Sequence, residues 1–172
     1  MKIIAILISI LIFSQTVNAV QTCKTYITDE WTDFRYTVAD ISGDNVVTDN
    51  KTGLMWKQCS EGLTGTDCGA GTLTTHTWKQ ALDLASTEDF AGFTDWRVPN
   101  QKELRTIVAI NCYLPSINAN VFPNTPSSWF WSSSPIASYD GFAWVVYFYD
   151  GYDYVINRDF DYRVRLVRSL GQ

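Results

Sequence analysis

The residues best suited to do chemistry are tyrosines and aspartates gathered near the C-terminus. Between Tyr139 and Arg163, a stretch of 25 positions, the sequence holds ten aromatic residues and five aspartates. Tyrosine offers a large contact area and a hydroxyl at low entropic cost, and aspartate adds hydrogen-bond acceptors. A pair of these aspartates could serve as the two carboxylates of a glycoside hydrolase. Their alternation with tyrosine along predicted strands and turns is more typical of a surface that contacts a ligand.

The other candidates for catalysis are weaker. His76, the only histidine, lies in the polar run THTW just before a predicted helix, so we expect it at the surface. Ser132, Ser133 and Ser134 supply hydroxyls but lack the G-x-S-x-G context of an activated serine. The cysteines lack the C-x-x-C spacing typical of a zinc site. The sequence therefore predicts no catalytic constellation, no metal site and no cofactor.

The residue set of the Tyr139–Arg163 stretch is restricted. It contains no Glu, Gln, Lys or Met, although Glu and Lys are among the commonest residues of globular proteins. Apart from Trp144, every residue type in the stretch can be reached from the codon AAC by changing only its adenines, and the four absent types cannot. A half-exposed sheet explains the tyrosines, but it does not explain why Asp is used without Glu. On this codon pattern, Trp144 is expected to stay the same while the residues around it vary.

The same stretch has the pattern of a β-hairpin. Residues 143–149 alternate with the two-residue period of a strand. Asp150-Gly151 is a dipeptide that suits the positive φ angles of a type I′ turn. The pattern then predicts a returning strand over Tyr152–Ile156 and a third strand of the same sheet over Tyr162–Arg168.

Sequence patterns in the middle of the chain predict shorter elements of secondary structure. Asn45–Thr48 and Leu54–Trp56 are expected to be strands, joined by the Asp/Asn/Gly turn DNKTG. Tyr26–Val38 has no clear period and predicts at most a short strand. The Pro-, Asn- and Ser-rich segment Tyr113–Ser128 is predicted to be a long ordered loop.

Two helices are expected before the C-terminal strands. The first spans Trp78 to about Thr87, with a capping box from Thr77 and Gln80. The second spans about Gln101–Ile110, where Asn100 caps the helix, Glu103 occupies the N3 position, and the buried stripe is Leu104, Ile107 and Val108. Two short helices followed by strands, without β-α-β alternation, predict an α+β fold.

The N-terminus has the pattern of an export signal. Lys2 precedes an apolar run over residues 3–13, and Val17-Asn18-Ala19 forms a small-residue cleavage site. We therefore expect a signal peptide over residues 1–19 and a single mature domain over residues 20–172, with no further run that could span a membrane. Removing Lys2 with the signal takes the 13 basic residues to 12 against 18 acidic ones, so the net charge becomes −6. Such an acidic chain is a poor binder of nucleic acid.

Four cysteines in an exported chain suggest two disulfides. Cys59 and Cys68 flank the Gly/Thr-rich loop SEGLTGTD, which closes easily, and we prefer to pair them. Cys23 is then left to pair with Cys112. Three connectivities are possible for four cysteines, so this pairing is a preference among them.

Several motifs together resemble one family. DNKTGLMW, TWKQAL, DWRVPNQKEL, the Phe122-Pro123 pair, WSSS, AWVVYF and VRLVR occur in the order seen in the Lcl C-terminal domain family, named for a Legionella collagen-like adhesin. The resemblance covers about Val46–Arg168. It implies a bacterial, often exported protein without established enzymatic activity. It also implies a C-type-lectin-like fold, related to that of formylglycine-generating enzymes, in which two helices pack on a small, twisted, mostly antiparallel sheet.

The C-terminal stretch resembles a narrower subset of this family. In that subset a diversity-generating retroelement rewrites the segment between AW and VRLVR by mutating adenines, which agrees with the codon pattern. The resemblance implies a fixed scaffold of Trp131, Trp144, Val164 and Leu166. It implies ligand contacts at Tyr139, Asp140, Phe142, Tyr147, Tyr149, Asp150, Tyr152, Asp153, Tyr154, Asn157, Asp159, Phe160, Asp161 and Tyr162.

The function predicted from these observations is that of an exported, adhesin- or receptor-type binding module. Its ligand is expected to be a protein or a glycan at a cell or phage surface. The Glu-Pro-Asn type motif of calcium-dependent sugar binding is absent, because Val98-Pro99-Asn100 lacks the acid. The alternative is a secreted enzyme, either a glycoside hydrolase or an oxidoreductase like the formylglycine-generating enzymes. The latter needs paired redox cysteines, whereas all four cysteines here are expected in disulfides.

Overall fold

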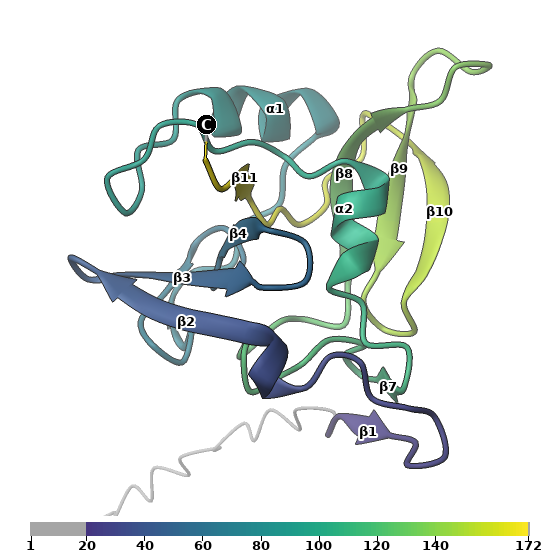
Figure 1. Cartoon of the computed structure of the whole chain (residues 1–172). Coiled ribbons are helices and arrows are strands. Elements are labelled where there is room, and N and C mark those ends of the chain that lie inside the picture. The colour runs from purple at the N-terminus through teal and green to yellow at the C-terminus, as the bar shows by residue number, and fades with distance from the viewer. Residues whose placement is uncertain (1–19, 172) are drawn as a thin grey trace, which may run out of the picture.

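The computed structural model describes residues 20–171, and the predicted signal peptide lies outside them. The described chain forms small antiparallel sheets and two α-helices (Figure 1). This arrangement confirms the predicted combination of helices with mostly antiparallel sheets.

The first main sheet has the strand order β11-β4-β3-β2. Its strands are β2 (Tyr36–Ile41), β3 (Asp44–Asp49), β4 (Leu54–Lys57) and β11 (Val167–Ser169). The predicted turn between β3 and β4 is present, and the Gly53 N–H donates to the Asp49 carbonyl at 2.8 Å. β2 is a full six-residue strand, longer than its irregular sequence predicts. Its pairing with β3 along the whole length supplies the order that the sequence pattern lacks.

The second main sheet has the order β10-β9-β8 and carries the predicted hairpin. Its strands are β8 (Trp129–Pro135), β9 (Phe142–Tyr147) and β10 (Tyr152–Asn157). Tyr147 pairs with Tyr152, so residues 148–151 form the connecting loop. The predicted type I′ turn is therefore wrong. Such a turn needs two consecutive residues with positive φ, and in this loop only Gly151 has one, at 83°.

The predicted third strand over Tyr162–Arg168 is also wrong, because β8 occupies that place in the sheet. The segment instead bridges the two sheets: Tyr162 pairs with His76 and Arg163 with Phe130, and β11 then pairs with β4. Val164, Arg165 and Leu166 are all fully buried. A segment enclosed on both faces cannot lie at the open edge of a hairpin, and so it threads between the two sheets.

Helix α1 (Trp78–Ser86) and helix α2 (Gln101–Thr106) begin with the capping boxes that the sequence predicts. α2 ends earlier than expected. Beyond it the Ala109 N–H donates to the Ser116 carbonyl at 3.0 Å, a tertiary partner in place of the next helical one. The three residues predicted to form the buried stripe are nevertheless fully buried. The minor elements are η1 (Asp33–Arg35), β1 (Thr22–Cys23), β5 (Leu63–Thr64), β6 (Ala70–Gly71) and β7 (Cys112–Tyr113).

Both predicted disulfides are present. Cys23–Cys112 joins β1 to β7, and Cys59–Cys68 closes the Gly/Thr-rich loop. The first bond attaches the N-terminal segment to the body of the domain. No cysteine of the described chain is left free.

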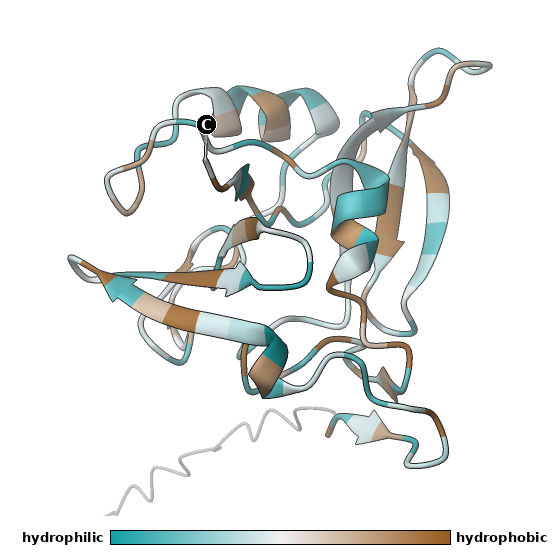
Figure 2. Cartoon of the chain, in the orientation of Figure 1, coloured by the Kyte–Doolittle hydropathy of each residue, from teal (hydrophilic) through white to brown (hydrophobic). Residues whose placement is uncertain are grey.

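The core lies on both faces of the β8-β9-β10 sheet. Alternate residues of β9 enter two hydrophobic clusters, Val146 in one and Ala143 and Val145 in the other. The first cluster includes α2 and β3 residues, and the second includes α1 residues. Figure 2 shows strongly apolar residues on part of β9, as well as on β2, β3, β4 and α1. β9 is therefore the central strand of the molecule and a rigid support for whatever its neighbours display.

The hairpin loop provides a first testable prediction. A Cβ atom at Gly151 would lie 2.5 Å from Val108 Cγ1, and φ at this position is +83°. We expect Gly151→Ala to lower the unfolding free energy by about 2–5 kcal/mol, the sum of a left-handed backbone cost and an overpacking cost. Chemical denaturation measures the loss.

The matched control for this prediction is Gly141→Ala. Gly141 has the same φ of +83°, but a Cβ there meets nothing within 4 Å. Only the backbone cost of about 1–2 kcal/mol is expected. Equal losses for the two variants would show that the Val108 contact does not restrict this loop.

Candidate ligand-binding face

An aromatic surface runs along the side of the β8-β9-β10 sheet where Trp129 lies. Trp129 and Tyr152 both pair with Tyr147 across the sheet, and directly opposed residues of an antiparallel sheet project from the same face. The Trp129 ring stacks on the Tyr147 ring with centroids 4.3 Å apart and meets the Tyr154 ring edge-on at 4.6 Å. Tyr147 stacks in turn on Tyr149 at 5.5 Å.

The same surface continues onto the loop after β10. Tyr162 lies 6.1 Å from Trp129 and 6.4 Å from Phe160, measured between ring centroids. These contacts join six rings into one chain. We call it the aromatic ladder, and it consists of Tyr149, Tyr147, Trp129, Tyr154, Tyr162 and Phe160.

Some rings of the ladder, its rim, are exposed to solvent, and the others, its base, are half-buried against the fold. Tyr154 and Phe160 expose 40% and 59% of their surface, and Tyr152 beside them exposes 65%. Trp129, Tyr147 and Tyr162 are half-buried. Burial raises the pKa of the Tyr162 hydroxyl, so this group is protonated and neutral near pH 7. The side chains that reach solvent thus stand on rings that the fold holds in place.

Trp129 is the functional candidate that sequence reasoning missed. It contacts three other rings of the ladder, but it lies before the restricted stretch and shows no codon signal. The only sequence clue is its spacing of two from Trp131, which places both on one face of a strand.

Acidic residues flank the ladder. Asp159 and Asp161 are exposed next to Phe160 and Tyr162, and Asp150 is half-buried at the hairpin loop, where it accepts the Tyr152 N–H at 3.1 Å. Asp140 is also exposed, but it lies on the loop between β8 and β9, next to Tyr139. The nearby Arg158 is turned toward the scaffold, with its guanidinium 4.2 Å from the centroid of the Trp78 ring. The ladder face is therefore aromatic and acidic.

Not all predicted contacts lie on this surface. Asp153 was expected to point outward, but it faces α2 instead, where it pairs with Arg105 and accepts a hydrogen bond from Gln101. The reason is the strand period: Tyr152 and Tyr154 project from the ladder face, so Asp153 must project from the other.

A second group also lies away from the ladder. Tyr139, Phe142 and Val155 line an apolar hollow of about 220 Å³. Asn157 bonds the backbone, since its Oδ1 accepts the Asp159 N–H at 2.9 Å. The fourteen predicted contacts therefore divide between the ladder face, the opposite face of the sheet and the connecting loops.

The predicted scaffold is buried with one exception. Trp131, Val164 and Leu166 are fully buried, with no exposed surface. Trp144 is only half-buried and belongs to neither core cluster. It is therefore less enclosed than the rest of the predicted scaffold, and its partner on β10 is the exposed Val155.

The candidate catalytic groups are engaged in the fold. His76 Nε2 lies 3.0 Å from Thr74 Oγ1, and its backbone exchanges hydrogen bonds with Tyr162. Burial lowers the pKa of His76 despite the charge of Asp161. The fully buried Ser132 donates its hydroxyl to the Trp144 carbonyl at 2.8 Å.

Within residues 20–171, no three His, Cys, Asp or Glu side chains gather closely enough to hold a metal ion. No helix of this same part of the chain has the length and apolarity to cross a membrane.

The comparisons with known proteins place the chain in a family. Among curated proteins, no match to it is found. The model of the Lcl C-terminal domain matches residues 45–168. This region includes β4, both helices, the three strands of the β8-β9-β10 sheet and the buried 162–168 segment. The match covers well over half of the sequence, and the chain therefore belongs to the Lcl C-terminal domain family.

Proposed function

We propose that this chain is an exported binding module of the adhesin or receptor type, which contacts a protein or glycan ligand through the aromatic ladder and its acidic rim. The observation that carries the proposal is the linked set of aromatic rings, with exposed members at the rim and fixed members at the base. Exposed tyrosine and tryptophan side chains on a rigid support are typical of interfaces, because little side-chain entropy is lost on binding.

Family membership and the disulfides support the same class of function. The Lcl C-terminal domain family indicates an extracellular binding module. Two disulfides are consistent with an exported protein, since such bonds persist in oxidising compartments. We also infer that the protein is not an enzyme, because His76 pairs with Thr74 and the hydroxyl of the fully buried Ser132 is bonded to the Trp144 carbonyl, so the two do not form a nucleophile–base pair.

The finer part of the proposal is that a retroelement diversifies this face on a C-type-lectin-like scaffold. Exposed Tyr139, Tyr152, Tyr154 and Phe160 lie in the restricted stretch, while the neighbouring Trp131 is buried. Sequencing the genomic locus tests it. We expect a reverse-transcriptase gene and an imperfect repeat of the codons for residues 139–163; a locus with neither would refute diversification without affecting the binding role.

The binding role is tested by exchanging exposed rings for small polar residues. The purified mature domain is first applied to a glycan array and to an array of cell-surface proteins to find a binding partner. We expect the double variant Tyr152→Ser, Tyr154→Ser to weaken that binding at least tenfold, because aromatic anchors dominate interfaces. Tyr152→Ser alone should change stability by no more than about 0.5 kcal/mol. Tyr154→Ser should cost somewhat more, since its ring contacts Trp129.

The matched control is Tyr26→Ser. Tyr26 exposes 82% of its surface but belongs to the N-terminal segment between β1 and η1 and not to the β8-β9-β10 sheet. Its loss should change neither binding nor melting temperature. The proposal fails if the double variant binds like the wild type, or if binding and stability are lost together.

A further inference from the structure

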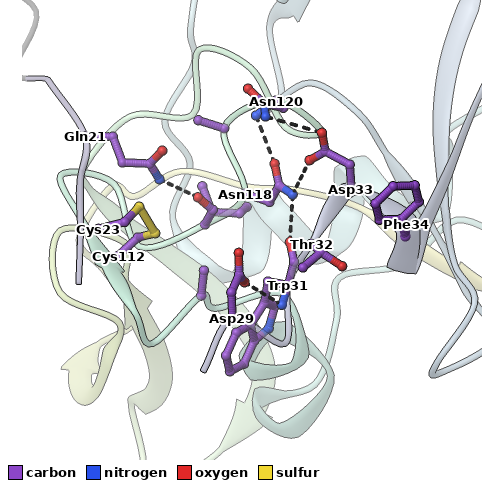
Figure 3. A pocket seen from close by; sticks show the side chains of 13 residues that line it. Gln21, Cys23, Asp29, Trp31, Thr32, Asp33, Phe34, Cys112, Asn118 and Asn120 are labelled. Atoms are coloured by element: carbon purple, nitrogen blue, oxygen red, sulfur yellow. Dashed lines mark hydrogen bonds between the residues drawn. A yellow bond between two sulfur atoms is a disulfide. The ribbon is translucent and has the colours of Figure 1, made fainter. Parts of the chain in front are cut away.

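A second concave site lies where the N-terminal segment, which precedes the family match, meets residues 109–120 of the domain. Residues 21–34 and 109–120 line a pocket of about 340 Å³, within the size range of small-ligand sites (Figure 3). The Cys23–Cys112 disulfide is part of its wall. Gln21 closes one side, with its amide bonded to the carbonyls of Pro115 and Ile117. The pocket thus lies where the N-terminal segment meets the rest of the domain, and the disulfide holds these two parts together.

The polar groups of the pocket are fixed relative to one another. Asn118 Nδ2 donates to Asp33 Oδ1 and to the Trp31 carbonyl, each at 2.7 Å. Asn120 Nδ2 donates to Asp33 Oδ2 at 3.3 Å (Figure 3). These carboxylate–amide pairs place acceptors and donors side by side. Neighbouring hydroxyls of a polyol present the same mixture of donors and acceptors.

The charge of the pocket selects against anions. Its lining includes the carboxylates of Asp29 and Asp33 and contains no Lys, Arg or His. Neither carboxylate takes part in an ion pair with the described residues. A sulfated or carboxylated ligand would meet two like charges there, and like charges across an interface disfavour binding.

Two aromatic residues complete the lining. Trp31 is held by its indole N–H, which donates to the Thr106 carbonyl at 2.8 Å. Phe34 exposes 98% of its surface, which is unusual for a residue of this type. Such a ring covers no part of the core, so its exposure is available to a ligand.

A neighbouring hollow extends the site. It has a volume of about 450 Å³ and shares Gln21 and Ala119 with the first pocket. Its other lining residues are uncharged: Pro115, Asn124, Thr125, Pro126 and Ser127. Two adjoining hollows along one face suit an extended ligand of repeating units better than a single compact one.

We propose that these two hollows form a groove that binds a neutral oligosaccharide. The carboxylate–amide pairs bond the sugar hydroxyls, and Phe34 contacts the apolar face of a sugar ring. This site is separate from the aromatic ladder and does not depend on the proposed function.

The experiment titrates the mature domain with maltotriose, cellotriose and chitotriose, and with a sulfated trisaccharide, by isothermal calorimetry. We expect at least one neutral trisaccharide to bind and the sulfated one not to bind. Phe34→Ala and Asp33→Ala should each weaken the binding about tenfold. Tyr26→Ala removes another exposed aromatic of the same segment, outside the groove, and should leave the binding unchanged. Tyr152→Ser, beside the ladder, should also leave it unchanged.

Several outcomes overturn this inference. One is that none of the three neutral trisaccharides binds, and another is that the sulfated one binds more tightly. A third is that binding is lost in Tyr152→Ser but kept in Phe34→Ala, which would assign it to the ladder. Melting temperatures of all variants are measured alongside, and Phe34→Ala serves even if Asp33→Ala unfolds, because its side chain is exposed.

Discussion

Replacing Arg165 with alanine is expected to lower the unfolding free energy by about 3–5 kcal/mol. The guanidinium has no exposed surface and lies 4.9 Å from the centre of the Phe122 ring. It donates to the carbonyls of Lys57 and Gln58 and to the hydroxyls of Ser60 and Thr125. Alanine would leave these acceptors buried without donors and open a cavity between the two sheets.

The cost is specific to the planar fork of arginine. Burial lowers the pKa of Arg165, and the charge of Glu61 counters this effect. Burying the charged guanidinium is therefore unfavourable by itself, and its hydrogen bonds stabilise it in the core. Arg165→Lys should recover little of the loss, because an ammonium group cannot reach four acceptors in that geometry.

Arg163→Ala is the matched control. Arg163 is half-buried and donates to the Thr74 carbonyl at 3.1 Å, so its loss should cost far less. Urea denaturation of the three variants gives the comparison. An Arg165→Lys variant as stable as the wild type would contradict the proposed bonding.

The second large effect is expected at Trp131. Trp131→Ala should lower the unfolding free energy by about 3–5 kcal/mol, because the side chain is fully buried and its removal leaves a cavity. Its indole N–H donates to the His76 carbonyl at 2.7 Å, and its ring lies 5.2 Å from Tyr162 of the ladder. The substitution should therefore also displace the base of the ladder and weaken ligand binding.

Trp144→Ala provides the comparison for this residue type. Because Trp144 is half-buried and outside both clusters, its replacement should cost clearly less than that of Trp131. Thermal and urea unfolding of both variants decide the ranking. Equal costs would mean that Trp144 supports the fold as strongly as the fully buried tryptophan.

Several features of this protein follow from short stretches of sequence. The capping boxes at Thr77 and Asn100 involve residues three positions apart, and the turn after Asp49 closes within five residues. The partners of such local bonds are set by sequence spacing alone, which is why helix starts and this turn are predictable. The Cys59–Cys68 loop belongs to the same class, and it leaves only one partner for Cys23. The ordered motifs likewise suffice to predict the family.

The tertiary structure alone decided how distant segments meet. The sequence pattern predicts strand alternation, but the register between strands determines which aromatic residues share a face, and so Trp129 joins the ladder while Asp153 turns to Arg105. The 162–168 segment has an alternating pattern typical of an edge strand, yet long-range packing encloses both its faces between two sheets. The N-terminal groove depends on Asn118 reaching Asp33 across 85 positions. Contacts of that separation depend on the closure of the whole chain, and no local residue pattern encodes them.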